Sequence, residues 1–288
     1  MTALIFPGQG SQEPGMGREF YSSEVFAAGS RVAGRDLAAL CQSDAETLSR
    51  TENAQLAVFA VSMAMYAAWA AENGRPAAMA GFSLGECSAL CAAGVLSLED
   101  GFRLVQKRAE LMQASCRDAN GAMSALLGGE PPQPYEDGED WAVPVNFNCP
   151  GQTVIAGTPG GVAALEAQCK ASGGRAARLA LSGAFHTKMM SGAGEMLKAF
   201  AATLAFSEPA APLYTNLSGE ILHPGADVPR HLELHMTHPV LWQKCVENML
   251  AAGVTRFVEM GHGSSLAKLI KRIDRGVEVS SAAHPAPR

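Results

Sequence analysis

The stretch Gly81-Phe82-Ser83-Leu84-Gly85 decides the fold of this 288-residue chain. It follows a short apolar segment, 77–80, that is typical of a buried strand, and it precedes a helical pattern from about Glu86 to Gly94. A G-x-S-x-G sequence between a strand and a helix forms a nucleophile elbow, in which a tight turn holds the serine in strained backbone angles. The helix amides point at the serine and can bind an oxyanion. We therefore predict a nucleophilic Ser83; the alternative is a structural turn.

Strands and helices alternate outward from this elbow. Residues 3–6 predict a strand followed by a glycine-rich loop, and residues 54–72 predict a long apolar helix. A further strand, 255–260, precedes the last helix. This alternation predicts an α/β fold with a mostly parallel sheet.

The pattern changes in the middle of the chain. Between about 121 and 183, short strand candidates lie close together around a single predicted helix, about 160–172. We therefore expect a large α/β domain, residues 1–120 and 184–288, and a small α+β subdomain, residues 121–183, inserted into it.

Composition excludes several classes of protein. The chain is 48% hydrophobic and 17% charged, which excludes disorder, a coiled coil and collagen. Its formal net charge of −6 gives no chain-wide basic surface, so we expect no nucleic-acid partner.

Cysteine usage and hydropathy bear on the cellular compartment. The seven cysteines are an odd number and form no C-x-x-C pair, so we expect reduced thiols, no metal site and a cytoplasmic protein. No signal peptide is visible at the N-terminus. The longest apolar run, 57–71, is too short and too rich in small residues to span a bilayer, so we expect no membrane partner. It predicts a buried helix that ends at Gly74.

A nucleophilic serine needs a base, and the chain has seven histidines. His262 follows a late strand in a glycine loop, where an α/β-hydrolase places its histidine. His186 lies where the inserted subdomain rejoins the large domain, a good place for a cleft. We expect His284 in the C-terminal tail and the remaining four at the surface or at helix ends. Pattern alone leaves His186 and His262 open.

Six motifs in order resemble the malonyl-CoA:acyl carrier protein transacylase family, which is related to the acyltransferase domains of polyketide synthases. They are Gly8-Gln9-Gly10-Ser11-Gln12, Gly81-Phe82-Ser83-Leu84-Gly85-Glu86, Gln106-Lys107-Arg108 with Met112, Asn146-Phe147-Asn148-Cys149-Pro150-Gly151-Gln152, Gly183-Ala184-Phe185-His186 and Val258-Glu259-Met260-Gly261-His262-Gly263. The resemblance implies an α/β-hydrolase-like large domain and a ferredoxin-like small subdomain.

The resemblance also assigns catalytic roles. Ser83 is the implied nucleophile and His186 the implied base, with the backbone N–H groups of Gln9 and Leu84 forming the oxyanion hole. In this family a backbone carbonyl orients the base, here near Leu241. A missing acidic member of the triad is therefore no objection.

Substrate-binding residues follow from the same motifs. Arg108 is implied to pair with the free carboxylate of a malonyl group, which suits a planar guanidinium. Phe185 resembles the residue associated with malonyl rather than methylmalonyl units. Met112, Asn148 and Gln152 are the other residues that we expect to bind substrate.

The chain departs from the family pattern at four places. Phe82 replaces the usual histidine beside the nucleophile, and His262 replaces the usual proline, which argues against His262 as the base. Ala109 stands where glycine is common. The proline-rich segment 130–138 occupies the place of the first helix of the ferredoxin-like subdomain, so we predict that this helix is lost or very short.

The implied function is malonyl transfer from malonyl-CoA to a phosphopantetheinylated acyl carrier protein in fatty-acid biosynthesis, by a ping-pong reaction through a malonyl-serine ester. We expect a monomer that needs no cofactor. The alternatives are an acyl hydrolase, a non-catalytic subunit that binds a carrier protein, and a free-standing acyltransferase of a polyketide synthase.

Overall fold

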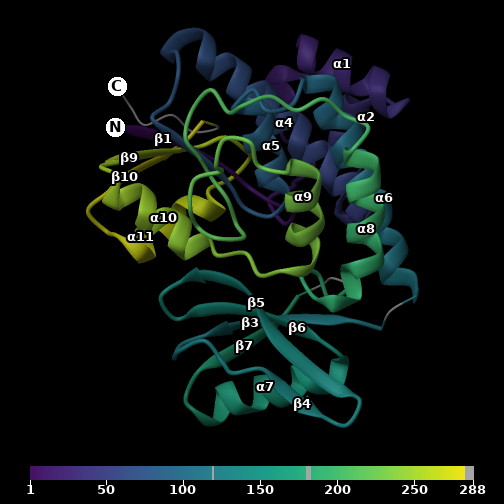
Figure 1. Ribbon diagram of the computed structural model, residues 1–288, viewed down its shortest axis with the longest axis vertical. Helices are drawn as coiled ribbons and strands as arrows, with labels where there is room; N and C mark the ends of the chain where they lie inside the picture. The colour runs from purple at the N-terminus through teal and green to yellow at the C-terminus, as the bar shows by residue number, and fades with distance from the viewer. Residues whose placement is uncertain (119, 180–182, 283–288) are drawn as a thin grey trace.

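The computed structural model describes residues 1–118, 120–179 and 183–282, and these form two separate sheets (Figure 1). The first sheet has five strands in the order β10-β9-β1-β2-β8, and every neighbouring pair is parallel. Its strands are β1 (Thr2–Phe6), β2 (Ala78–Gly81), β8 (Leu213–Tyr214), β9 (Arg256–Glu259) and β10 (Glu278–Ser281). The predicted α/β fold with a parallel sheet is confirmed.

The second sheet is antiparallel and lies below the first in Figure 1. Its strand order is β4-β5-β6-β3-β7, and α7 (Pro159–Ala171) packs against all five strands. The strands are β3 (Ala122–Leu127), β4 (Tyr135–Asp137), β5 (Asp140–Cys149), β6 (Gln152–Gly157) and β7 (Arg175–Arg178). All of them fall within the span 121–183, where we predicted the small subdomain; the domain boundaries stay a prediction.

The proline-rich segment 130–138 forms no helix. Residues 131–134 are irregular, and β4 follows them as an edge strand that pairs with β5. Prolines lack the N–H that a helix needs, which explains the extended path. The prediction that a helix is lost here is confirmed.

Side chains alternate across the parallel sheet and build a core on each face. From β1, Leu4 and Phe6 point into the larger core, which contains residues of α4 (Thr51–Asn73), α5 (Leu84–Ala92) and α6 (Leu98–Asp118). Ala3 and Ile5 point into the other core, against α10 (Trp242–Ala251) and α11 (Ser265–Ile273).

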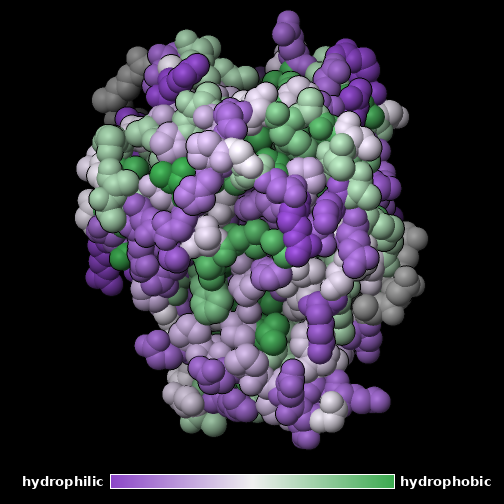
Figure 2. Space-filling model, in the orientation of Figure 1, coloured by the Kyte–Doolittle hydropathy of each residue, from purple (hydrophilic) through white to green (hydrophobic). Residues whose placement is uncertain are grey.

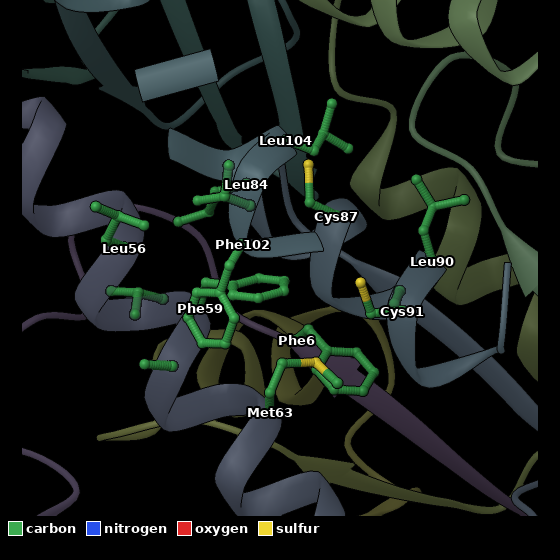
Figure 3. Close-up of a cluster of buried hydrophobic side chains, with 14 of the residues drawn as sticks. Phe6, Leu56, Phe59, Met63, Leu84, Cys87, Leu90, Cys91, Phe102 and Leu104 are labelled. Carbon is green, nitrogen blue, oxygen red and sulfur yellow. The ribbon is translucent and has the colours of Figure 1, made fainter. Parts of the chain in front are cut away.

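The larger core packs against α5, the helix that begins at the elbow. In Figure 3 the aromatic rings of Phe59 and Phe102 lie among buried side chains of α4, α5 and α6, close to Leu84. Their ring centroids are 4.9 Å apart in an edge-to-face arrangement, a favourable geometry. The first turn of α5 is therefore fixed by packing.

The remaining helical segments cover the parallel sheet or link its parts. In the larger core, α8 (Ser191–Ala201) and α9 (Val228–Thr237) pack against each other, and α8 also contacts α6. These segments are η1 (Arg18–Phe20), α1 (Glu24–Ala33), α2 (Leu37–Cys41), α3 (Ala45–Ser49), η2 (Lys188–Met190), α8 (Ser191–Ala201) and α9 (Val228–Thr237).

Helix α4 is an apolar helix of 23 residues. Among the described residues it is the one helix long and apolar enough to cross a membrane by length and composition, so the prediction that this apolar segment is too short to span a bilayer was wrong. In its most apolar 18-residue window, 67% is buried inside the protein, as in the core helix of a globular domain. It ends at Asn73, where Gly74 caps it with a φ of 72°, as predicted.

Candidate active site

The elbow has the predicted strand–turn–helix geometry. Ser83 lies between β2 and α5 with φ 52° and ψ −109°, a conformation that costs a non-glycine residue free energy. A Cβ atom on Gly81 would lie 1.9 Å from the backbone of Gly85, and one on Gly85 would lie 2.0 Å from the carbonyl oxygen of Phe6. Only glycine fits at these two positions, so the motif is required by the turn.

The structure brings Ser83 and His186 together. The distance from Ser83 Oγ to His186 Nε2 is 2.8 Å, and His186 Nδ1 lies 2.9 Å from the carbonyl oxygen of His235. Because a carbonyl only accepts hydrogen bonds, Nδ1 carries the proton and Nε2 presents its lone pair to the serine hydroxyl. This is the arrangement of a nucleophile and its base.

The residue that orients the base is not Leu241. The N–H of Leu241 donates to the backbone oxygen of Asn216 at the start of α10, whereas the carbonyl that accepts from His186 belongs to His235. His235 lies in the last turn of α9, where carbonyls lose their helical partners. Residue 239, four positions later, is a proline without an N–H, which leaves this carbonyl free for His186.

The surroundings of His186 keep its imidazole neutral. Burial, together with the nearby His235 and Arg108, lowers its pKa to about 3, and hydrogen bonds to backbone carbonyls oppose this only in part. A neutral imidazole can accept a proton from Ser83 over the whole physiological pH range.

The competing histidine lies elsewhere. His262 Nε2 is 3.0 Å from Glu13 Oε2 in an exposed pair, and not beside the serine. Of the histidines that we expected at the surface or at helix ends, His235 does end a helix but is only 1% exposed, and His231 bonds the buried Glu86. Nothing in the local sequence marks His235 as buried or His231 as the partner of a buried carboxylate.

Arg108 is a buried cation beside the nucleophile. Its side chain projects from α6, is 2% exposed, and donates to Gln55 Oε1 at 2.6 Å and to Ser83 Oγ at 3.2 Å. No carboxylate among the described residues forms an ion pair with it. Burial lowers its pKa, so the site favours a bound anion that would restore the lost solvation.

A pocket of about 250 Å³ collects the expected site residues. Figure 2 shows hydrophobic surface gathered in a hollow between the part of the molecule with the parallel sheet and the part with the antiparallel sheet. Leu241 does not line this pocket. The lining residues include Gln9, Ser83, Leu84, Arg108, Met112, Asn148, Gln152, Phe185 and His186.

Polar groups on β5 and β6 face this pocket together with apolar side chains. Asn146 and Asn148 are about 7% and 6% exposed, and the Oδ1 atom of each is buried without a partner among the described residues. Gln152 accepts a 2.6 Å hydrogen bond from Arg272, which fixes its side chain at the pocket wall. Phe185 is 5% exposed and narrows the space beside the dyad.

Two backbone amides are available for an oxyanion. Gln9 and Leu84 both line the pocket, and within the described ranges neither backbone N–H donates to a protein acceptor. A Cβ atom on Gly8 would lie 2.5 Å from the carbonyl oxygen of Phe82, so glycine lets the loop approach the elbow. Phe82 itself packs edge-on against Trp242 at 5.7 Å.

Asn216 is a site residue that the sequence did not reveal. Its Oδ1 accepts the N–H of Ser83 at 2.8 Å, and its Nδ2 donates to the carbonyl oxygen of Gly81 at 2.7 Å. Asn216 follows β8, the strand next to β2. Neighbouring parallel strands end at the same edge of a sheet and build sites there, but the local sequence does not show that β8 lies beside β2.

Comparisons with known proteins agree with this site. A model of the acyl transferase domain matches residues 3–285. The chain belongs to the acyl transferase domain family. This acyl transferase is 38% identical over 297 residues to the malonyl CoA-acyl carrier protein transacylase of Escherichia coli K12, covering 99% of this chain and 96% of the relative.

Solved structures give the same result for the fold. A malonyl-CoA:acyl carrier protein transacylase from Xanthomonas oryzae pv. oryzae superposes on this acyl transferase with a TM-score of 0.90 and 39% identity, covering 99% and 95% of the two chains. A malonyl-transacylase in complex with a type II PKS acyl-carrier protein superposes with a TM-score of 0.88 and 34% identity, covering 97% and 94%. The two-sheet architecture is that of these enzymes.

Proposed function

We propose that this acyltransferase moves a malonyl group from malonyl-CoA to the pantetheine thiol of an acyl carrier protein in fatty-acid biosynthesis. The observation that carries the proposal is Arg108, a buried guanidinium without an ion pair among the described residues, 3.2 Å from Ser83 Oγ. A malonyl thioester places a carboxylate one CH₂ group from the reacting carbonyl. The short distance therefore suits a short dicarboxylate.

The first half-reaction acylates Ser83. His186 Nε2 takes the hydroxyl proton while Oγ attacks the thioester carbonyl, and the amides of Gln9 and Leu84 receive the oxyanion. The C–S bond then breaks, and the departing CoA sulfur takes the proton from His186. Arg108 exchanges its bond to Ser83 Oγ for the malonyl carboxylate.

The second half-reaction transfers the acyl group. The carrier's thiol gives its proton to His186 and attacks the ester carbonyl, and Ser83 leaves with that proton. We propose that Phe185, Met112, Asn148 and Gln152 enclose the malonyl group. We also propose that the protein works as a cytoplasmic monomer and that neither half-reaction needs a cofactor.

Two features at the pocket rim suit an acidic carrier protein. Lys188 lies 4.6 Å above the ring of Trp141, beside a second cavity of about 530 Å³ that also reaches His186. Arg272 donates hydrogen bonds to Gln152, which lines the pocket, and to the carbonyl oxygen of Pro150. These cations offer local positive charge on a chain whose net charge is −6.

A hydrolase is the second candidate, since the same dyad could pass acyl groups to water. Arg108 argues against a plain esterase, because such an enzyme gains nothing from a buried cation. The pathway is a separate question. One structural relative is bound to a type II PKS acyl-carrier protein, and a polyketide role would use the same chemistry.

One experiment tests the proposal. The protein is incubated with malonyl-CoA, its intact mass is measured, and a phosphopantetheinylated acyl carrier protein is then added. We expect a malonyl adduct that is absent from Ser83→Ala and passes to the carrier. Absence of the adduct, or its release only as free malonate, would overturn the proposal in favour of the hydrolase or a binding subunit. Carriers from fatty-acid and polyketide pathways, compared by kcat/KM, separate the two roles.

A further inference from the structure

We propose that Asn216 and His235 are positioning residues that together hold Ser83 in its reactive conformation and in line with His186. Neither side chain lines the pocket that holds the dyad, so both act through other residues. The inference rests on the proposed acyl transfer only in taking Ser83 as a nucleophile.

The side chain of Asn216 forms a clamp on the elbow, which here means its two hydrogen bonds to the backbone on either side of the turn. Its two side-chain bonds, to the N–H of Ser83 and to the carbonyl of Gly81, bracket the strained turn. Because a backbone N–H can only donate and a carbonyl can only accept, these two bonds also fix which end of the amide is oxygen. Without them, the elbow could relax toward ordinary backbone angles, and Oγ would move away from His186.

His235 connects the clamp to the base. Its ring Nε2 lies 3.1 Å from Asn216 Oδ1, while its own carbonyl accepts from His186 Nδ1 at 2.9 Å. Since Asn216 Oδ1 is an acceptor, His235 Nε2 must carry a proton. His235 is thereby linked to both members of the dyad, to His186 through its carbonyl and to Ser83 through Asn216.

The buried carboxylate of Glu86 holds this arrangement in place. The Glu86 carboxylate accepts the backbone N–H of Asn216 through Oε2 and bonds His231 Nε2 through Oε1. Glu86 is 1% exposed and comes from α5, the helix that begins directly after Ser83. Helix α5 therefore holds the backbone of Asn216 through Glu86. The side chain of Asn216 in turn holds Ser83, the residue directly before α5.

Substitutions can separate the side chain of His235 from its carbonyl. His235→Leu removes the ring donor and keeps the carbonyl, whereas His235→Gln offers an amide N–H in place of the ring N–H. Asn216→Ala removes the clamp. The matched control is Asn248→Ala, since Asn248 donates to the carbonyl of Gly219 at 2.8 Å in a part-buried bond outside the dyad.

The test measures the reactivity of Ser83 without its substrate. A fluorophosphonate probe forms an O–P bond with Oγ, expels fluoride and leaves the serine proton on His186, so its labelling rate reports the alignment of the dyad. We measure this rate, the kcat and KM for malonyl transfer, and the thermal midpoint of each variant.

We expect Asn216→Ala and His235→Leu to lower the labelling rate and kcat by about 10²-fold with KM unchanged, because Arg108 and the pocket stay in place. His235→Gln should recover at least about tenfold, and Asn248→Ala should label as the wild type does. Folded variants that label at the wild-type rate, or a His235→Gln as slow as His235→Leu, would overturn the inference. If Asn216→Ala does not fold, the comparison of His235→Leu with His235→Gln tests the inference. A wild type that labels but accepts no malonyl group would refute the proposed function alone.

Discussion

Replacing Arg108 with methionine removes the buried cation and keeps much of its volume. The guanidinium has five N–H donors, of which one bonds Gln55 and another bonds Ser83. Three donors remain, enough for two parallel bonds to a malonyl carboxylate. The dyad itself does not depend on Arg108, because His186 accepts the serine hydroxyl directly.

The expected loss of activity follows from the two hydrogen bonds between Arg108 and the malonyl carboxylate. A hydrogen bond to a charged group contributes about 1.5–3 kcal/mol, so the pair contributes roughly 3–6 kcal/mol. Water that enters the emptied space offsets part of this. A net loss of about 3–4 kcal/mol corresponds to a fall of roughly 10²–10³-fold in kcat/KM for malonyl-CoA, at about 1.4 kcal/mol per tenfold.

The assay compares two thioesters. Acetyl-CoA lacks the carboxylate, so we expect its kcat/KM to change by less than about threefold in Arg108→Met. The control is Lys107→Met, because Lys107 precedes Arg108 on the same helix and forms only a long surface pair with Glu110, 3.7 Å apart. An equal fall for malonyl-CoA and acetyl-CoA would refute the reasoning and show that Arg108 supports the elbow instead.

Three further predictions concern the base, acid stability and the turn. His186→Ala should abolish the malonyl adduct in intact mass, while His262→Ala keeps it; the opposite result would move the base to His262. Burial lowers the pKa of His186 to about 3 and that of His235 to about 4, so below pH 6.5 only the unfolded state takes up these protons. Urea unfolding should therefore show stability falling with pH from 6.5 toward 3, by up to about 1.4 kcal/mol per pH unit for each histidine; a flat profile would contradict this. Gly85→Ala, with its Cβ 2.0 Å from the Phe6 oxygen, should destabilise the protein by about 3 kcal/mol, and an unchanged Tm would count against it.

Features encoded by side-chain type were predictable from the sequence. The elbow required glycine at two positions, and no other residue fits there. The prolines in 130–138 excluded a helix, and Gly74 marked the end of α4. In each case the residue type restricts the backbone directly, so the local sequence is sufficient.

Features encoded by the backbone or by distant pairing were not predictable. The carbonyl that orients His186 comes from His235 and not from Leu241. Every residue has a backbone carbonyl, so the residue type does not show which one binds His186. Pro239 lies just beyond the end of α9, but which carbonyl is left free for His186 depends on where the helix lies in the fold. Asn216 meets Ser83 across 133 positions in the chain, and only the pairing of β2 with β8 brings them together.

Ser83 and His186 are the only non-glycine residues with a positive φ in the part of the chain that the structure describes, at 52° and 61°. Strain of this kind costs about 1–3 kcal/mol for each residue, and glycine at either position would relieve it. A library of variants selected only for heat resistance should therefore gather glycine at the two positions that the chemistry needs. For anyone who engineers this enzyme, survival at high temperature is a misleading guide, and each round of selection should also require turnover.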